Sequence, residues 1–440
     1  MPSHFAVGLW TASLLVSAAW PQTKPADEPA GDSNWSLHFQ ATSIGQWHGS
    51  FRSLYQGENS LPAHPEKRVS LTSTLFLTRR LTRHLEIVVD PEIAGGKGFG
   101  EVTGIAGFTN GEIPRVSSAT PTPYVARAFL RTSWALGPET ENADKAVNQL
   151  AGAMPVRRFT VITGKFSVTD YFDNNTYSHD PRSQFMNWAI MYNGAWDYPA
   201  DVRGYTVGAL SELTERRWSL RAASAMEPTA ANGPTLDTRV ARNRGEVIEW
   251  EGRYKPRGRP GAFRALAFAN RERAGTYREA ISGADTTGLG PTRRPGTLKY
   301  GFGLNLEQSL TPEIGVFSRY GWSDGKTESW AFTEIDRTIS GGLALDGKLW
   351  KRAKDRIGIG GARNYLSGDH RSFLAAGGMG FIIGDGRLNY GPESTVEAYY
   401  SWSLTNWFTV TGDFQHVWNP AYNRDRGPVP VASIRLHLER

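Results

Sequence analysis

The sequence contains one pattern that resembles a catalytic nucleophile. Gly321-Trp322-Ser323-Asp324-Gly325 matches G-x-S-x-G, the elbow that presents a serine for acyl transfer in α/β-hydrolases. That chemistry needs a sharp turn from a strand into a helix, topped by backbone N–H groups that stabilise the oxyanion. The residues from Lys326 to Phe332 are instead typical of a polar loop that enters another strand. We therefore interpret the pattern as a hairpin turn and expect no enzyme.

Two further segments hold residue types that bind phosphate or metal ions. The glycine-rich segment Gly95 to Gly100 contains G-x-G, but it lacks the Lys-Ser/Thr ending and the following amphipathic helix of a phosphate-binding loop. The segment Asp170 to Asn175 offers oxygen ligands of the kind that Ca²⁺ prefers, without the spacing of an EF-hand. Asp and Asn at a strand end are also ordinary turn formers. The sequence therefore predicts no metal and no cofactor.

Composition narrows the class of protein. The chain has 440 residues, of which 48 are Gly and 12% are aromatic, as in proteins built from many short strands. It has no Cys, which excludes thiolate metal sites, cysteine nucleophiles and disulfides. The 49 Lys and Arg and the 43 Asp and Glu are mixed along the chain, whereas a nucleic-acid-binding surface would need a clustered basic stripe. We expect no nucleic-acid partner.

The elements that must position any functional group are β-strands. From Val69 to Leu77, Val and Leu fall on one face of the chain and Ser and Thr on the other, and the same alternation resumes from Leu85 to Asp90 after Arg79-Arg80. A period of two with one apolar and one polar face predicts a strand. The short polar link between the two segments predicts a hairpin.

Similar alternation recurs along the chain, and the polar faces carry charges of both signs. Ala126, Ala128, Leu130 and Trp134 alternate with Arg127, Phe129, Arg131 and Ser133; Ile248, Trp250 and Tyr254 with Glu249, Glu251 and Arg253; Tyr300, Phe302, Leu304 and Leu306 with Lys299, Asn305 and Glu307; and Val429, Val431, Ile434, Leu436 and Leu438, imperfectly, with Arg435 and His437. At about 10 residues per membrane strand, the chain accommodates about sixteen strands. Ser323 to Lys326 and Gly384 to Gly386 supply turns. The periodicity alone fits both a soluble β-protein and a water-filled membrane barrel.

The N-terminus predicts export. Ala6 to Trp20 is an apolar stretch followed by Pro- and Ala-rich sequence, which is typical of a signal peptide. We expect a signal peptide at 1–20, a flexible mature N-terminus at 21–33 and a single barrel domain at 34–440. Beyond residue 20 no stretch approaches the ~18–20 apolar residues of a membrane-spanning helix. A membrane protein of this sequence would therefore have to be a closed barrel, because only that form satisfies its backbone.

Several motifs, in order and at suitable spacing, resemble a known family. They are Gly164-Lys165-Phe166, Tyr171-Phe172-Asp173, Asp180-Pro181-Arg182-Ser183-Gln184-Phe185-Met186-Asn187-Trp188, Gly377-Gly378-Met379-Gly380-Phe381, Glu397-Ala398-Tyr399-Tyr400, Asp413-Phe414-Gln415 and Asn419-Pro420-Ala421-Tyr422-Asn423. Together they resemble the OprB-type carbohydrate-selective porins over about Arg158 to Leu438. The resemblance implies an all-β, transmembrane antiparallel β-barrel of about sixteen strands in the outer membrane of a Gram-negative cell. It also implies passive diffusion of carbohydrates through a lumen constricted by charged residues.

Within that frame, a set of side chains is predicted to line the pore. They are Arg127, Arg131, Glu249, Glu251 and Arg319, followed by Glu86 and Asp90, with Trp188 and Trp196 as aromatic faces for a sugar. For each charged residue the alternative is a rim or interstrand ion pair with no contact to solute. For both tryptophans it is a place in an interfacial aromatic girdle. The segment Gly95 to Asn110 is predicted to fold into the lumen.

Two other functions are left open by the sequence. The barrel could be a surface-exposed binding or adhesion protein with a plugged lumen, or a channel for organic acids or other small solutes. A secreted soluble hydrolase is disfavoured because no nucleophile or metal constellation is found. The expected partners are mono- or oligosaccharides and outer-membrane lipid. A homo-oligomer is left open.

Overall fold

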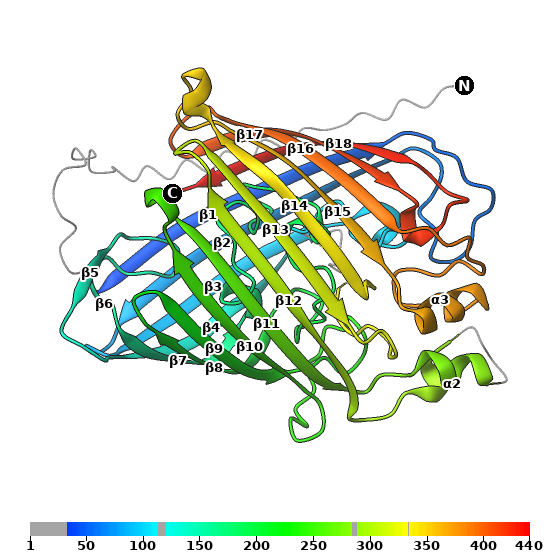
Figure 1. The fold of residues 1–440 in the computed structure, drawn as a ribbon, viewed down its shortest axis with the longest axis horizontal. Coiled ribbons are helices and arrows are strands. Elements are labelled where there is room, and N and C mark those ends of the chain that lie inside the picture. Colours follow the sequence, from blue (N-terminus) through cyan, green and yellow to red (C-terminus); the bar gives the residue numbers. More distant parts are fainter. Residues whose placement is uncertain (1–32, 113–119, 284–287, 333) are drawn as a thin grey trace.

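The computed structural model describes residues 33–112, 120–283, 288–332 and 334–440, so the expected signal peptide at 1–20 lies outside the described residues. The described strands form a closed antiparallel barrel (Figure 1) in which each strand pairs with its neighbours along the chain and the first pairs with the last. The sixteen barrel strands are β1 (Trp35–His48), β2 (Glu66–Arg80), β3 (Leu85–Gly96), β4 (Thr122–Ala135), β7 (Arg158–Phe166), β8 (Thr206–Thr214), β9 (Trp218–Met226), β10 (Arg244–Tyr254), β11 (Gly261–Glu272), β12 (Thr297–Ser309), β13 (Ile314–Ser323), β14 (Arg337–Asp346), β15 (Arg356–Tyr365), β16 (Glu393–Ser403), β17 (Phe408–Trp418) and β18 (Val429–Glu439). The predicted fold class and strand number are confirmed.

The remaining elements are short. A separate hairpin is formed by β5 (Thr140–Ala143) and β6 (Gly152–Pro155). The α-helices are α1 (Trp188–Met191), α2 (Tyr277–Ser282) and α3 (Gly368–Ala375), and the 3-10 turns are η1 (Phe99–Glu101), η2 (Val168–Asp170), η3 (Pro256–Gly258), η4 (Gly290–Thr292), η5 (Gly347–Trp350) and η6 (Pro420–Tyr422). No helix in the described part of the chain is long and apolar enough to cross a membrane.

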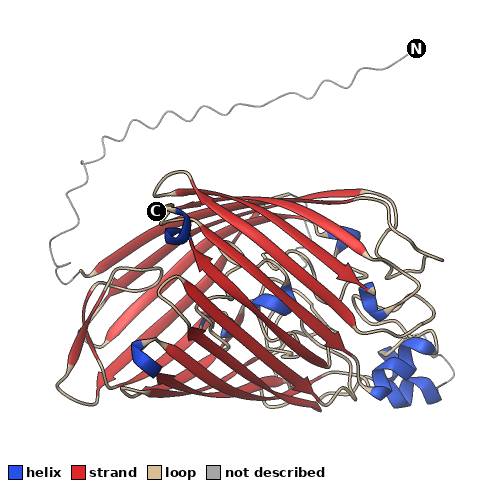
Figure 2. Cartoon of the chain, turned by 45° about the horizontal axis from the view of Figure 1, so that its top comes forward, coloured by secondary structure: helices blue, strands red, loops and turns tan. Residues whose placement is uncertain are grey.

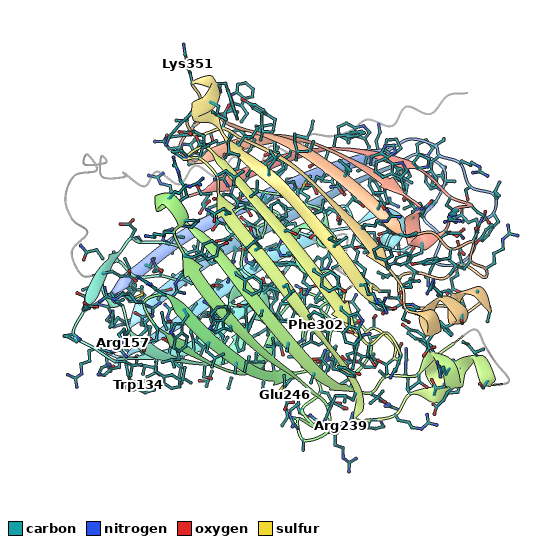
Figure 3. The ribbon with its side chains drawn as sticks, in the orientation of Figure 1. Trp134, Arg157, Arg239, Glu246, Phe302 and Lys351 are labelled. Atoms are coloured by element: carbon teal, nitrogen blue, oxygen red, sulfur yellow. The ribbon has the colours of Figure 1, made fainter. Side chains whose placement is uncertain are left out.

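The strands turn their apolar face outward, which a water-soluble barrel would not do. In β12, Phe302 is 38% exposed on the outside, whereas Lys299 is 1% exposed on the inside. Trp134 likewise projects away from the barrel wall (Figure 3). Alternation of lipid-facing apolar and lumen-facing polar residues is the arrangement of transmembrane barrels. The burial pattern therefore favours a water-filled membrane barrel over a soluble β-protein, which periodicity alone could not separate.

Two local departures from the expected alternation have structural causes. Ala126, predicted to share the outer face of its strand, is buried because the register between β3 and β4 shifts beside it, which is a β-bulge. In β18, Val429 and Val431 point inward, where they pack with Phe99 and other buried side chains beneath the loops. The imperfect alternation of β18 thus reflects a small internal apolar cluster.

The two ends of the barrel differ. Apart from the connection that carries the β5–β6 hairpin, short turns join the strands at the end where both termini of the barrel lie, and long loops with α2 and α3 gather at the other (Figure 1). In transmembrane barrels the short turns face the periplasm and the long loops face outward. The predicted glycine turns are confirmed at Gly325 and Gly384, whose φ values are +59° and +100°. The strand β13 leads into a loop whose described residues form no helix before β14, so the G-x-S-x-G pattern is a turn.

Two loops fold into the space that the strands enclose, where Figure 2 shows loops and short helices. We name them the 97–112 loop, which follows β3, and the 167–205 loop, which joins β7 to β8 and contains α1. Gly95 and Gly96 belong to β3, and the rest of the Gly95 to Asn110 segment enters the lumen as predicted, where Thr109 exchanges hydrogen bonds with Gln46 of β1 at 2.9 and 3.0 Å. The lumen is therefore narrowed from within.

Candidate functional site

Two inward carboxylates of β16 hold the inner loops in place. Glu393 accepts the backbone N–H groups of Ala106 at 2.9 Å and Gly107 at 2.7 Å, both in the 97–112 loop. Glu397, four residues further along the same face, accepts those of Met186 at 2.5 Å and Asn187 at 2.9 Å in the 167–205 loop. Hydrogen bonds from backbone N–H groups to a buried carboxylate are charge-assisted and short. One strand thus fixes both loops.

An inward guanidinium fastens the 167–205 loop to another part of the wall. Arg319 of β13 is 1% exposed and donates to the backbone oxygens of Ser178 at 2.6 Å and Ile190 at 3.0 Å. It also contacts the carboxylate of Asp173 at 3.1 Å. Asp173 in turn accepts from Asn305 of β12 at 2.7 Å. The loop is therefore bonded to both β12–β13 and β16, and it spans the lumen between them.

The loops leave a cavity of about 400 Å³ beside the wall formed by β1–β4. Its charged lining consists of Arg127, Arg182, Arg203, Glu92, Glu112, Asp170, Asp180 and Glu439, and its aromatic lining of Phe76, Tyr124, Trp188, Tyr192, Tyr198, Tyr205 and Phe332. Glu439 belongs to the last strand, at the end with the short turns, whereas Phe332 belongs to the loop after β13. We take this cavity as the candidate functional site and name it the lumen cavity.

Opposite charges face each other across the lumen cavity. Arg182 of the 167–205 loop contacts Glu112 at 2.7 Å and Glu92 of β3 at 3.4 Å. Arg127 of β4 binds Asp170 with two nitrogens, at 2.5 and 2.6 Å. Burial raises the pKa of the Glu112 carboxyl above its ordinary value, although the charge of Arg182 opposes that shift. The cavity therefore presents both guanidinium forks and carboxylates to whatever occupies it.

Three aromatic rings form one wall of the lumen cavity. The ring of Phe332 lies 5.0 Å from Trp188 and 4.8 Å from Tyr198, and both pairs are stacked with 25° between their planes. Trp188 and Tyr198 are themselves stacked at 6.2 Å. Offset stacking at such distances is favourable for aromatic pairs. The result is a rigid apolar surface next to the charged groups.

Of the residues predicted from the sequence, Arg127 and Trp188 line the lumen cavity. Asp90 is buried behind Arg127, with 3.6 Å between its carboxylate and the guanidinium. Trp196 packs against Tyr198 and is not part of the cavity lining. The alternative of an interfacial girdle is wrong for both tryptophans, because each is buried inside the barrel.

The other predicted residues point inward away from the lumen cavity. Arg131 pairs with Glu86 across β3 and β4 at 2.7 Å. Glu249 and Glu251 both pair with Arg221 of β9, at 3.0 and 3.2 Å. These are the interstrand ion pairs that were the alternative for each charged residue. Whether any of them contacts solute stays a prediction.

The sequence analysis did not single out the acidic and basic partners in the loops. Arg182 stands within the Asp180 to Trp188 motif, and Glu112 follows the glycine-rich segment, but neither lies on a periodic strand. Tyr205 accompanies them, because its hydroxyl donates to Glu92 at 3.1 Å and its ring lies 5.3 Å from the Arg127 guanidinium. The available signal was the concentration of charged and aromatic residues within that motif.

A closed barrel with an apolar outer face and a lumen narrowed by inward loops defines an outer-membrane channel of the porin class. The family model described as carbohydrate-selective porin, OprB family, matches residues 72–439. The chain belongs to that family and is an outer-membrane carbohydrate porin, and the proteins of this family and fold are channels.

Solved porins share this fold. The high-pH structure of OprB from Pseudomonas putida is similar over 92% of this chain and 94% of that one, at 16% identity and a TM-score of 0.67. The outer-membrane channel DcaP of Acinetobacter baumannii is similar over 94% of this chain and 100% of that one, at 7% identity and a TM-score of 0.52. No curated protein matches by sequence.

Proposed function

We propose that the chain is a passive channel for mono- or oligosaccharides in a Gram-negative outer membrane, has no enzymatic activity, and selects its solutes in the lumen cavity. The observation that carries this proposal is the pairing of guanidinium forks and carboxylates with a stacked aromatic wall in one cavity. Both charged groups exchange hydrogen bonds with sugar hydroxyls, and the guanidinium does so in a planar, two-pronged way. The aromatic wall suits the apolar face of a pyranose ring.

Passage requires that the cavity bind weakly. A neutral sugar exchanges its hydrogen bonds to water for bonds of similar strength to the wall, and it must be released again on the far side. The carboxylates of the lining, Glu92 and Glu112 among them, already accept from Arg182. A sugar hydroxyl therefore competes with existing bonds, which limits its affinity.

Liposome swelling with a panel of solutes tests the proposal. Liposomes that contain the purified protein are expected to swell faster in neutral mono- and disaccharides than in organic acids of the same size. The acidic lining, which includes Glu112 and Asp170, repels an anion. Faster swelling in organic acids would favour a channel for organic acids or other small solutes. An absence of swelling and of open-channel conductance would favour a plugged binding or adhesion barrel.

Two arginines of β4 offer a matched comparison. Arg127→Ala is expected to raise ion conductance in a planar bilayer and to weaken block by sugar several-fold, because it removes a side chain that lines the lumen cavity. Arg131→Ala removes the same charge from the same face, four residues along, where the side chain binds Glu86 outside the cavity. It should change sugar block little. Equal effects of the two variants would remove Arg127 from the solute path.

A further inference from the structure

Six buried oxygen atoms lie in the region where β9, β10 and β11 meet the long loops. They are both carboxylate oxygens of Glu227, both of Glu272, and the side-chain oxygens of Asn243 and Asn270. Each of these four residues is 1% exposed or less. Among the described residues, none of the six oxygens accepts a hydrogen bond of ordinary geometry, although the Asn270 amide lies beside the Glu272 carboxylate. Buried polar atoms without partners are rare in folded proteins and need an explanation.

The strand register brings these residues to one level of the wall. Arg244 of β10 pairs with Met226 of β9 and with Arg271 of β11. One position closer to the long loops, Asn243 therefore stands between Glu227 and Glu272. Adjacent strands are about 4.8 Å apart, which lets the two glutamates reach toward the asparagine between them.

A glycine keeps the space between these side chains open. A Cβ atom on Gly245 would lie 2.6 Å from Glu227 Oε1 and 2.9 Å from Asn270 Oδ1, so both oxygens face the same small space. Gly245 pairs directly with Asn270 across β10 and β11. The ring of Pro199 borders the same space, with its Cγ 2.7 Å from that Cβ position, so oxygens from the ends of β9 and β11 share this space with one proline ring.

The orientation of the two amides is fixed by their nitrogen atoms. Asn243 Nδ2 donates to the carboxylate of Asp237 at 2.6 Å, and Asn270 Nδ2 donates to the backbone oxygen of Asp197. Each amide oxygen is thereby left on the side away from its nitrogen's partner. Oxygens of like partial charge repel unless a cation or a proton stands between them.

Lys299, the cation that acts on Glu272, is engaged with other groups. Lys299 Nζ lies 3.8 Å from Asp197 and donates to Thr327 and Ser329. Asp197 also accepts the backbone N–H groups of Trp330 and Ala331, each at 2.7 Å. The Asp197–Lys299 pair is therefore balanced by itself. No described side chain forms an ion pair with Glu227 or Glu272, although Lys299 acts on Glu272 at longer range.

We propose that Glu227, Glu272, Asn243 and Asn270 bind one Ca²⁺ ion, which ties the outer ends of β9, β10 and β11 together. The ligand set is all oxygen, carries two negative charges and includes two carboxylates that can bind through one or both oxygens, as Ca²⁺ prefers. It lacks the nitrogen and sulfur ligands that favour Zn²⁺. No three His, Cys, Asp or Glu side chains of the described chain form a metal-binding group, so this site depends on its two amides.

The site is independent of solute passage, because none of its four residues lines the lumen cavity. Its role would be structural. Glu227 directly follows β9 and Asn243 directly precedes β10, so a bound ion joins both ends of the loop between these strands to the wall. The loops at this end face outward in transmembrane barrels. Extracellular calcium sites have dissociation constants of about 10⁻⁴ to 10⁻³ M, and this site is expected in that range.

Calcium binding by the purified full chain tests the proposal directly. After removal of divalent ions with EGTA, equilibrium dialysis is expected to find one Ca²⁺ per chain, with Mg²⁺ binding more weakly. In Ca²⁺ at a hundred times the dissociation constant, the ratio of folded to unfolded protein should rise about a hundredfold. That rise appears as a higher melting temperature and a higher temperature for the shift in gel mobility.

Variants separate this site from the surface acids. Glu227→Gln together with Glu272→Gln should abolish both the stoichiometric Ca²⁺ and the effect of EGTA on melting. The control Glu279→Gln together with Asp369→Asn removes two acids of the same end that pair with Arg294 and Arg278, and it should behave as the unaltered chain.

The unaltered protein by itself can overturn the proposal, so the test does not depend on the folding of a variant. If the two carboxyl groups are instead protonated and bond each other or the amides, no stoichiometric Ca²⁺ binds and EGTA leaves the melting temperature unchanged. Retention of one Ca²⁺ by the Glu227→Gln and Glu272→Gln double variant would place the ion elsewhere and also refute the site.

Discussion

Arg319→Met is expected to open the channel. The substitution keeps most of the side-chain volume but removes every hydrogen bond that Arg319 donates to the 167–205 loop, including those to Ser178 and Ile190. It also leaves the buried carboxylate of Asp173 without its guanidinium. Removing one partner of a buried ion pair costs about 3–5 kcal/mol. Because the barrel ladder is untouched, that cost falls on the loop, which is expected to leave the wall.

Single-channel recording measures this outcome. Conductance should rise several-fold over that of the unaltered chain, sugar block should be lost, and a protease should cleave within 167–205 while the barrel stays intact. Arg278→Met is the matched control, since its side chain is 82% exposed on α2, outside the lumen. An Arg319→Met channel that keeps the conductance and protease resistance of the unaltered chain would mean that the remaining bonds from the wall, among them those of Glu397, Glu307 and Arg435, secure the loop.

The fold could be predicted from sequence because each strand meets two different environments. Lipid on one side and water on the other impose a period of two, which is visible in strands such as β12. The predicted alternation was wrong where a strand does not face water on its inner side. Val429 and Val431 face inward because loops cover that part of the lumen, so an apolar side chain there avoids both lipid and water.

The site was harder to predict from sequence. Alternation shows whether a side chain points into the lumen, but it does not show whether that side chain lies next to the cavity that the loops leave open. Arg127 and Arg131 share a face of β4, yet only the former lines the lumen cavity. The depth is set by loops whose partners are distant in sequence. Arg182 meets Glu112 across 70 residues, and Glu397 meets the backbone of Met186 across 211. A pattern within one strand carries no information on such contacts.

The same long-range pairing gives the second large prediction, which concerns ion selectivity. Arg182→Ala is expected to make the channel markedly more selective for cations, because Glu92 and Glu112 then face the lumen cavity without their guanidinium. A unit charge at about 4 Å contributes about 1 kcal/mol even in bulk water, or about a fivefold change in the local ion ratio. The reversal potential in a KCl gradient measures the shift.

The raised pKa of Glu112 predicts how the change in cation selectivity depends on pH. Burial raises that pKa, and Arg182 is the main charge that opposes the rise. Without Arg182, the Glu112 carboxyl stays neutral up to a higher pH. The gain in cation selectivity should therefore grow as the pH rises through the raised pKa, where the carboxyl becomes charged, and should shrink at lower pH. Arg182→Ala together with Glu112→Gln removes one charge of each sign and should return the reversal potential toward that of the unaltered channel. A single variant whose reversal potential stays unchanged at every pH would show that ions bypass this pair, and the solute path would then have to lie outside the lumen cavity.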